Sequence, residues 1–231
     1  ESIIAAQRPI EPGEEEHYFI LSEENALSRE LSESLNSQGF STTMIPKKVL
    51  GEEDHHNALR KHLLGAQIDI PAGQNFRQTV ILYVADSQSS ASRQVTDSLT
   101  LQQHHLSPVL HMFQILAAEK ELPPPRVTVV TRAAQADTDD RTLNPHAATL
   151  WGMIRSVMLE HPEFKCKLID LPAEPEQTDA ACVFRELLYR DSENQVLIRQ
   201  GRRRLARLTP QVLETGPRHN SAIQRLDTSG R

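Results

Sequence analysis

The stretch TVILYVA, residues 79–85, decides the fold. Its apolar residues follow one another without alternation, which is typical of a strand buried on both faces of a parallel sheet. Further short runs rich in apolar or β-branched residues predict strands at 17–21, 40–45, 127–131 and 166–171. Because buried strands of this kind need helices above and below them, the segments between them are expected to be helical.

Residues with helical spacing occupy most of the connecting segments. The first predicted helix carries Ala26, Leu27, Leu31 and Leu35, and it ends before Gly39, a residue suited to a helix C-terminus. Further helices are predicted at 54–65, about 92–120, about 144–160 and 179–189, with a loop at 68–77.

The long helix at about 92–120 contains Pro108, which is expected to kink or split it. The triple proline at 123–125 ends it, and the next helix opens at Asn144-Pro145, where proline costs no hydrogen bond. The inward-facing residues of the long helix are predicted to be Leu99, Leu106, Leu110, Phe113 and Leu116.

About five alternations of strand and helix predict a doubly wound parallel α/β sheet. Residues 196–198 and 205–208 flank Gly201, which predicts a β-hairpin at the C-terminal end. Folds of this class bind ligands at the carboxyl ends of their strands. The residues that follow each strand are therefore where functional chemistry is expected.

Composition excludes several classes of protein. The 231 residues suffice for one substantial domain, and a net charge of −6 speaks against a general nucleic-acid binder. No stretch reaches the roughly 18 apolar residues of a membrane span, and the acidic residues 1–16 lack the apolar region of a signal peptide. Cys166 and Cys182 are too few for a disulfide framework or a four-ligand zinc site. The expected location is cytoplasmic.

The first strand-to-helix turn is where a dinucleotide-binding domain has its glycine-rich loop. Here the turn at 21–29 reads LSEENALSR and contains no glycine. Glu23 and Glu24 place two carboxylates where a phosphate would bind. We interpret it as a Rossmann-like turn that binds no nucleotide and whose acids cap the helix. The alternative is that the acids hold a cation.

A short-chain reductase needs a tyrosine made acidic by a lysine, typically four residues further on. The tyrosines are Tyr18, Tyr83 and Tyr189, and the residues four positions on are Ser22, Ser87 and Glu193. Since none of these is lysine, and Tyr18 and Tyr83 fall within predicted strands, we interpret these two as core residues. The sequence therefore predicts no reductase machinery in this chain.

The histidines and arginines give weaker signals. His55-His56 and His104-His105 are adjacent pairs whose side chains point apart on a helix, and His104 with His111 makes only two ligands, so no metal site is predicted. Neither a P-loop nor a Gly-x-Ser-x-Gly elbow occurs. One basic cluster remains, which would protect an edge strand or dock another domain: Arg199, Arg202, Arg203, Arg204 and Arg207.

Three segments resemble one family. VTVVTRAA (127–134) is similar to its "VVTRGA" strand, and AATLWGMIRSVMLEHPE (147–163), followed by LIDLP (168–172), is similar to its "AALWGLGRVVALEHPE" signature. NQVLIRQGRR (194–203) is similar to its "QVALRDGRR" segment. The family is the structural subdomain of the ketoreductase region of modular polyketide synthases, and the resemblance extends over about 18–208.

In that family the ketoreductase has two Rossmann-like halves. The resemblance implies that this chain is the first half, a truncated Rossmann fold that binds no nucleotide and buttresses the second. The second half carries the glycine-rich loop, NADPH and the catalytic Tyr, Ser and Lys. No catalytic, cofactor-binding or metal-binding residue is therefore expected in this chain. NADPH is expected only in the catalytic half or in an adjacent enoylreductase.

The resemblance places the helix that carries Trp151 where a catalytic half has its tyrosine-bearing helix. Trp151 is therefore interpreted as a packing residue. Ile154 and Met158 lie near the same helix face, and we expect this face to pack against the strand segments 80–84 and 127–130.

The predicted organisation is a linker at 1–16, the ketoreductase structural subdomain at 17–209, and a second linker at 210–231. Residues 222–230 resemble the opening strand of an enoylreductase, and a pseudo-ketoreductase behind a methyltransferase remains an alternative arrangement. The chain starts without Met and ends on a polar run, which suggests a piece of a longer polypeptide.

The leading hypothesis is a non-catalytic structural domain whose partners are the catalytic ketoreductase half and neighbouring domains of the same synthase. One alternative is an interaction module in which Arg202 and Arg203 bind an acidic acyl carrier protein, or which pairs two synthase chains. Another alternative is a divergent NADPH-dependent reductase. Neither nucleic acid nor a membrane is an expected partner.

Overall fold

The computed structural model describes residues 16–51, 59–62, 78–85, 98–120, 123–137, 140, 142–189 and 191–207. Its strands are β1 (Glu16–Ser22), β2 (Ser41–Pro46), β3 (Gln78–Val84), β4 (Arg126–Arg132), β5 (Lys167–Leu171), β6 (Gln195–Arg199) and β7 (Arg202–Arg204). Its helices are α1 (Ala26–Ser37), α3 (Ser98–Ala118), α4 (Pro145–Glu160) and α5 (Asp179–Leu188), with 3-10 turns η1 (Lys47–Gly51) and η3 (Pro162–Phe164).

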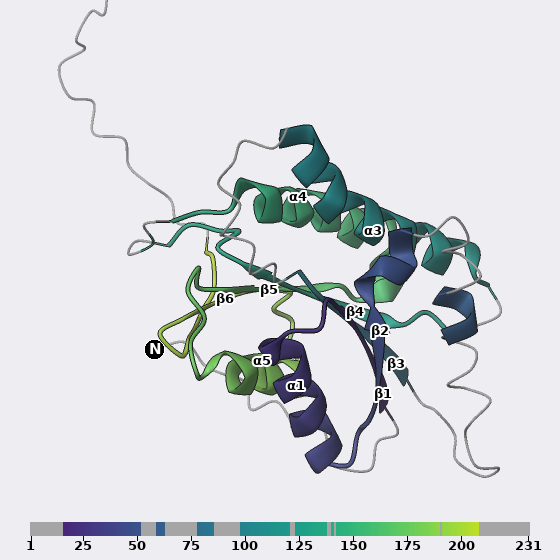
Figure 1. Ribbon diagram of the computed structural model, residues 1–231, viewed down its shortest axis with the longest axis horizontal. Coiled ribbons are helices and arrows are strands. Elements are labelled where there is room, and N and C mark those ends of the chain that lie inside the picture. The colour runs from purple at the N-terminus through teal and green to yellow at the C-terminus, as the bar shows by residue number, and fades with distance from the viewer. Residues whose placement is uncertain are drawn as a thin grey trace, which may run out of the picture.

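The strands form one sheet in the order β2-β1-β3-β4-β5-β6-β7. All neighbours are parallel except β6 and β7, which form an antiparallel hairpin. Figure 1 shows α3 and α4 on one face of the sheet and α1 and α5 on the other. The Rossmann-like, doubly wound sheet with a C-terminal hairpin, predicted from the sequence, is thereby confirmed.

Two apolar layers hold the sheet between its helices. Alternate residues of β1 and β3, such as Phe19 and Ile81, pack under α3 and α4, while their neighbours Ile20 and Leu82 pack against α1 and α5. Burial on both faces explains why β3 has no apolar–polar alternation.

The helix ends follow the sequence signals. Asn144 caps α4 by accepting hydrogen bonds from the backbone N–H groups of His146 and Ala147, and Pro145 is the first helical residue. After α1, Gly39 adopts a φ of +86°, in the left-handed region where a side chain would be strained.

Three expectations are wrong, one about which residue of α3 faces inward and two about where strands begin or end. Leu110 is 46% exposed, because the buried stripe of α3 runs through Val109, Met112, Phe113 and Leu116 and leaves Leu110 one helical step to the side. The second hairpin strand is 202–204 rather than 205–208, because Gln200 and Gly201 form a tight turn with positive φ. Glu16, assigned to the linker, is the first residue of β1.

Other predictions concern residues outside the described part of the chain. Of the helix expected at 54–65, the structure describes a helical turn at 59–62, where Leu59 is buried. The loop at 68–77, residues 92–97 of the long helix, and nearly all of both linkers lie outside it, as does the side chain of Leu99. Pro108 lies within α3, which continues through it. None of the described helices has the length and hydropathy that a membrane-spanning helix requires.

Candidate functional site

The strand order reverses at β1, since β2 lies on one side of it and β3 on the other. In open α/β sheets the ligand crevice lies at such a reversal, outside the carboxyl ends of the strands. The candidate site is therefore this edge of the sheet, formed by the turns after β1, β4 and β5.

The turn from β1 to α1 is closed by its own side chains. Asn25 is the N-cap residue: its side chain accepts a hydrogen bond from the Ser28 N–H (2.8 Å), and the Ser28 hydroxyl in turn accepts one from the Asn25 N–H (3.3 Å). Glu23 and Glu24 are exposed, and Glu24 pairs loosely with Arg29 at 3.8 Å. The expectation that these acids cap α1 is wrong, because the shorter Asn25 side chain is the one in capping position.

A cavity of about 450 Å³ lies beside this turn, next to the N-terminal ends of α1 and α5. Its charged lining residues in the described part of the chain are Glu23, Glu24, Glu30, Arg132, Glu176 and Asp179. The Arg132 guanidinium already donates to Asp179 (2.7 Å) and to the Pro172 carbonyl (3.2 Å). The cavity therefore presents excess negative charge to any ligand, the opposite of what a pyrophosphate requires.

The three tyrosines have unrelated surroundings. Tyr18 and Tyr83 are fully buried strand residues, as predicted, whereas Tyr189 is 50% exposed after α5. The Tyr18 hydroxyl donates to Glu16 at 2.8 Å. Among the residues four positions on, Ser87 lies outside the described part of the chain and Glu193 is paired with Arg207.

Tyr83 has a lysine neighbour that sequence spacing missed. The Lys47 ammonium lies over the Tyr83 ring, 5.6 Å from its centroid, because β2 and β3 both end beside β1. Burial, and then the charge of Glu23, raise the pKa of Tyr83 above its ordinary value. A reductase tyrosine needs a lowered pKa to give up its proton readily, whereas the raised pKa makes the Tyr83 phenol a weaker acid.

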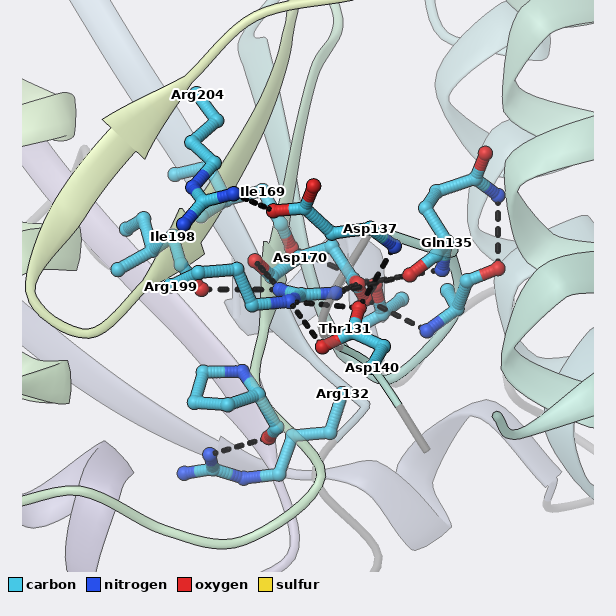
Figure 2. Close-up of polar contacts among 12 residues, drawn as sticks. Thr131, Arg132, Gln135, Asp137, Asp140, Ile169, Asp170, Ile198, Arg199 and Arg204 are labelled. Atoms are coloured by element: carbon cyan, nitrogen blue, oxygen red, sulfur yellow. Dashed lines mark hydrogen bonds and ion pairs between the residues drawn. The ribbon is translucent and has the colours of Figure 1, made fainter. Parts of the chain in front are cut away.

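Asp170, on β5, is the centre of a polar network at the carboxyl edge of the sheet (Figure 2). Its side chain is 0% exposed, and its carboxylate accepts from the Thr131 hydroxyl (2.6 Å) and from the backbone N–H groups of Ala134 (2.9 Å) and Gln135 (3.2 Å). A fourth hydrogen bond comes from Arg199 at 2.8 Å. The carboxylate therefore has donors on both oxygens within the chain itself.

Arg199, on β6, uses all its donors in the same network. Nε donates to the Asp140 carboxylate (2.9 Å), Nη1 to the carbonyls of Asp170 and Ile198, and Nη2 to the Gln135 carbonyl and the Asp170 carboxylate. Burial alone would lower the pKa of Arg199, but the hydrogen bonds and charges of Asp170 and Asp140 outweigh it and raise the pKa. A guanidinium has five N–H groups, so none remains for a phosphate or substrate.

The network continues into α4 through Trp151. The indole N–H donates to the Thr131 hydroxyl at 2.9 Å, and the Trp151 side chain is 1% exposed. Trp151 and Ile154 pack with Ile81, Tyr83, Val127 and Val129, while Met158 is only partly buried. The prediction that Trp151 is a buried packing residue facing these strands is confirmed.

Most arginines of the basic cluster bind residues of this chain. Arg203 pairs with Glu186 and Asp191, Arg204 pairs with Asp137, and Arg207 pairs with Glu193. Arg202 is exposed, and no partner for it lies among the described residues. Most of the positive charge of the hairpin is therefore neutralised by ion pairs that join it to α5 and to neighbouring loops.

The described histidine and cysteine side chains do not come together in one site. In the described part of the chain, no group of three or more potential ligands could hold a metal ion. The His111 ring contacts the Leu50 carbonyl at 3.0 Å, His55-His56 lie outside the described residues, and nothing is described of the His104-His105 side chains. Cys166 and Cys182 are buried free thiols.

Sequence reasoning missed the residue that organises this edge. In the sequence, Asp170 stood out only as part of LIDLP, and Arg199 only as a member of a basic cluster. Their pairing requires the register of β5 and β6, which places Asp170 opposite Leu197 and so within reach of Arg199. A buried-strand pattern interrupted by a single Asp was the available signal, because a charge at such a position needs a partner.

Comparisons with known proteins agree with this fold. The family model described as the Rossmann fold domain of the polyketide synthase extender module SpnB matches residues 32–208. One component of the phenolphthiocerol/phthiocerol polyketide synthase of Mycobacterium tuberculosis is 32% identical over 114 residues, which are 49% of this chain and 7% of that protein. The pikromycin polyketide synthase component PikAIII of Streptomyces venezuelae is 38% identical over 86 residues, 36% of this chain and 6% of that protein.

Solved structures show the same fold. A C2-type ketoreductase from a modular polyketide synthase aligns with a TM-score of 0.58 at 20% identity, over 86% of this chain and 42% of its own. A putative short-chain alcohol dehydrogenase from Burkholderia multivorans aligns with a TM-score of 0.56 at 12% identity, over 82% of this chain and 98% of its own. The chain thus shares its fold with nearly the whole of the dehydrogenase chain and with less than half of the ketoreductase chain.

Proposed function

The chain belongs to the family of Rossmann-fold domains of polyketide synthase extender modules typified by SpnB, and on this basis we propose that it is a non-catalytic structural domain of such a synthase. Its role is to buttress a catalytic ketoreductase half, or the processing domains beside it, during chain extension. It binds no cofactor itself, and NADPH is held by the catalytic half or by an adjacent enoylreductase.

The observation that carries this proposal is that the polar groups at the carboxyl edge of the sheet are bonded to one another. A catalytic Rossmann domain keeps donors there for cofactor and substrate. In this chain Asp170 and Arg199 satisfy each other, Arg132 is held by Asp179, and the first turn offers carboxylates instead of glycine N–H groups. The polar groups at this edge thus hold the domain together.

The relatives support the partners that we propose. The aligned segments cover only 7% and 6% of two polyketide synthase proteins, so a chain of this kind has many neighbouring domains in such proteins. The ketoreductase of known structure is more than twice as long as the part that aligns with this chain. A second half of comparable size is the partner that this ratio suggests.

A direct binding experiment tests the proposal. The 231-residue chain is titrated against NADPH, with the cofactor's fluorescence as the readout and a two-half ketoreductase as the positive control. We expect no saturable binding up to about 1 mM, because the turn after β1 repels phosphate. Saturation at micromolar NADPH would overturn the structural role and support the divergent reductase instead.

A second candidate function rests on Arg202, the exposed arginine at the start of β7. As an unpaired cation in the described part of the chain, it suits an acidic partner surface such as a carrier protein. The test measures how tightly the wild type and the Arg202→Glu variant bind the carrier protein at low and high salt. If Arg202 contacts the carrier, the affinity of the wild type should fall with salt and the variant should bind more weakly. Arg203→Glu is unsuitable, because Arg203 already pairs with Glu186 and Asp191 and its loss would disturb the fold.

A further inference from the structure

The amino edge of the sheet, at the opposite ends of the strands from the candidate site, is hollowed. A cavity of about 510 Å³ lies there, against the first residues of β4 and β5 and the loop before β6, and this volume falls within the range of ligand pockets. Its apolar lining comes from the ends of α4 and α5 and from η3: Met158, Pro162, Leu187 and Tyr189. Tyr189 is 50% exposed and Met158 is partly buried, so this amino-edge cavity leaves apolar surface uncovered.

Most charged side chains that line the amino-edge cavity are already neutralised within the chain. The pairs are Lys167–Glu186 (2.8 Å), Arg126–Glu16 (3.5 Å), Asp191–Arg203 and Glu193–Arg207. Paired charges offer little attraction to a free ion, whereas uncovered apolar surface is stabilised when an apolar occupant removes it from water. The lining therefore favours an uncharged, largely apolar occupant.

The described part of the chain ends at the rim of this cavity. β7 is antiparallel to β6, with Arg204 opposite Leu197, so the chain that leaves β7 runs back towards the amino edge. The last described residue, Arg207, is held by the Glu193 carboxylate, with Nη2 at 2.5 Å from Oε1 and Nη1 at 3.1 Å from Oε2. Glu193 itself lines the cavity. Residue 208 therefore follows a residue that is fixed at the cavity.

The next five residues, LTPQV (208–212), have a pattern that suits this surface. Leu208, Pro210 and Val212 alternate with polar residues, and in an extended backbone alternate residues point to the same side. Pro210 also favours an extended conformation of the residue before it. Five extended residues span about 17 Å, which is enough to cross three neighbouring strands spaced about 4.8 Å apart.

We propose that residues 208–212 lie in the amino-edge cavity, with Leu208, Pro210 and Val212 facing Tyr189. The docked segment covers apolar surface that the described residues leave open, and it extends the domain beyond the boundary expected at 209. A domain that follows in the same polypeptide is thereby anchored at the amino edge, away from the candidate site. The inference goes beyond the proposed structural role and does not depend on it, because it concerns contacts within this chain.

Single-cysteine labelling of the folded 231-residue chain tests the proposal. Val212→Cys and Gln211→Cys place a thiol on the two sides of the segment, and Ala222→Cys provides a reference further along the chain. N-ethylmaleimide is the reagent, and peptide mass spectrometry resolves each new thiol from the buried Cys166 and Cys182. We expect Val212→Cys to react at least about tenfold more slowly than Gln211→Cys, because the buried side must first open. Gln211→Cys should react like Ala222→Cys.

Two further substitutions test the cavity itself. Tyr189→Ala removes exposed apolar lining, so in the Val212→Cys chain it should raise the labelling rate towards that of Gln211→Cys. The matched control is Leu159→Ala, which removes an 85% exposed apolar side chain of α4 that is not among the described lining residues. This control should leave the rate unchanged. Circular dichroism confirms that each variant is folded.

The labelling rates decide the proposal. Equal rates for Val212→Cys and Gln211→Cys would overturn it, whether both thiols react fast or both react slowly. An unchanged rate in Tyr189→Ala, or an equal rise in Leu159→Ala, would overturn the assignment of the segment to this cavity. The NADPH titration is independent of these rates, so a failure here is distinguishable from a failure of the proposed structural role.

Discussion

Arg199 is a buried residue, although the sequence placed it in a cluster of charged residues typical of an exposed edge strand. Its side chain is 5% exposed and ties β6 to β5 and to the loop after β4, through Asp170, Asp140 and the Gln135 carbonyl. Lysine could not replace it, because only a planar guanidinium reaches five acceptors in these directions. The positive charge at this position is therefore an internal clamp for the edge where other Rossmann domains bind ligands.

Removing this clamp should be costly. Arg199→Met leaves the Asp170 carboxylate buried without its counter-ion, so we expect a loss of about 3–5 kcal/mol in the free energy of unfolding. In the double variant Asp170→Asn/Arg199→Met the loss should be smaller than the sum of the two single losses, because the uncompensated charge is gone. Urea unfolding measures all three variants. Arg202→Met is the control and should change stability by less than about 0.5 kcal/mol; an equal effect of both arginine variants would contradict the clamp.

Trp151 contributes both volume and one hydrogen bond, and two substitutions separate them. Trp151→Ala should cost about 3–5 kcal/mol, the usual loss for a buried large aromatic side chain. Trp151→Phe keeps most of the apolar contact but removes the N–H donor to Thr131, which should cost about 1 kcal/mol for the hydrogen bond. Denaturant unfolding of both variants beside wild type measures the difference. Near-equal losses would mean that the hydrogen bond rather than packing carries the stability.

At the scale of elements, local signals predicted local features. The run at 79–85 became β3, Asn144-Pro145 opened α4, and Gly39 took the left-handed conformation after α1. The errors lie where the decisive contact is distant in sequence. Whether Leu110 or Val109 faces inward depends on where α3 meets η1 and α4, and periodicity alone leaves the helix rotation open by one residue.

The candidate site was less predictable than the elements. The missing glycines of the turn after β1 were visible in the sequence, because that motif is contiguous. The Lys47–Tyr83 contact joins η1 to β3, and the Asp170–Arg199 network joins β5 to β6; neither spacing is fixed by a local rule. Sequence reasoning thus identified the missing glycine motif, whereas the sheet order was needed to show which side chains lie together at this edge.

At the scale of the whole molecule, the fold keeps the Cys166 thiol and the Tyr83 phenol protonated at a high pH at which the unfolded chain would ionise them. Burial, with a smaller contribution from the charge of Glu163, raises the pKa of the Cys166 thiol from about 9 to about 12. Burial and Glu23 raise the pKa of Tyr83 above its ordinary value near 10. Both groups lie beneath α3 and α4, so neither can ionise without disturbing the same apolar layer.

The sign of the resulting pH dependence follows from proton counts. Above about pH 9 the unfolded chain loses these protons while the folded chain keeps them, so stability is full below that pH and falls as pH rises, by up to about 1.4 kcal/mol per pH unit for each group. Urea unfolding of wild type from pH 7 to pH 11 should show this decline. Cys166→Ala should flatten it from about pH 9 upward, and Tyr83→Phe from about pH 10, whatever stability each variant loses at pH 7. Variant curves parallel to wild type at all pH values would show that neither buried group is linked to the alkaline loss of stability.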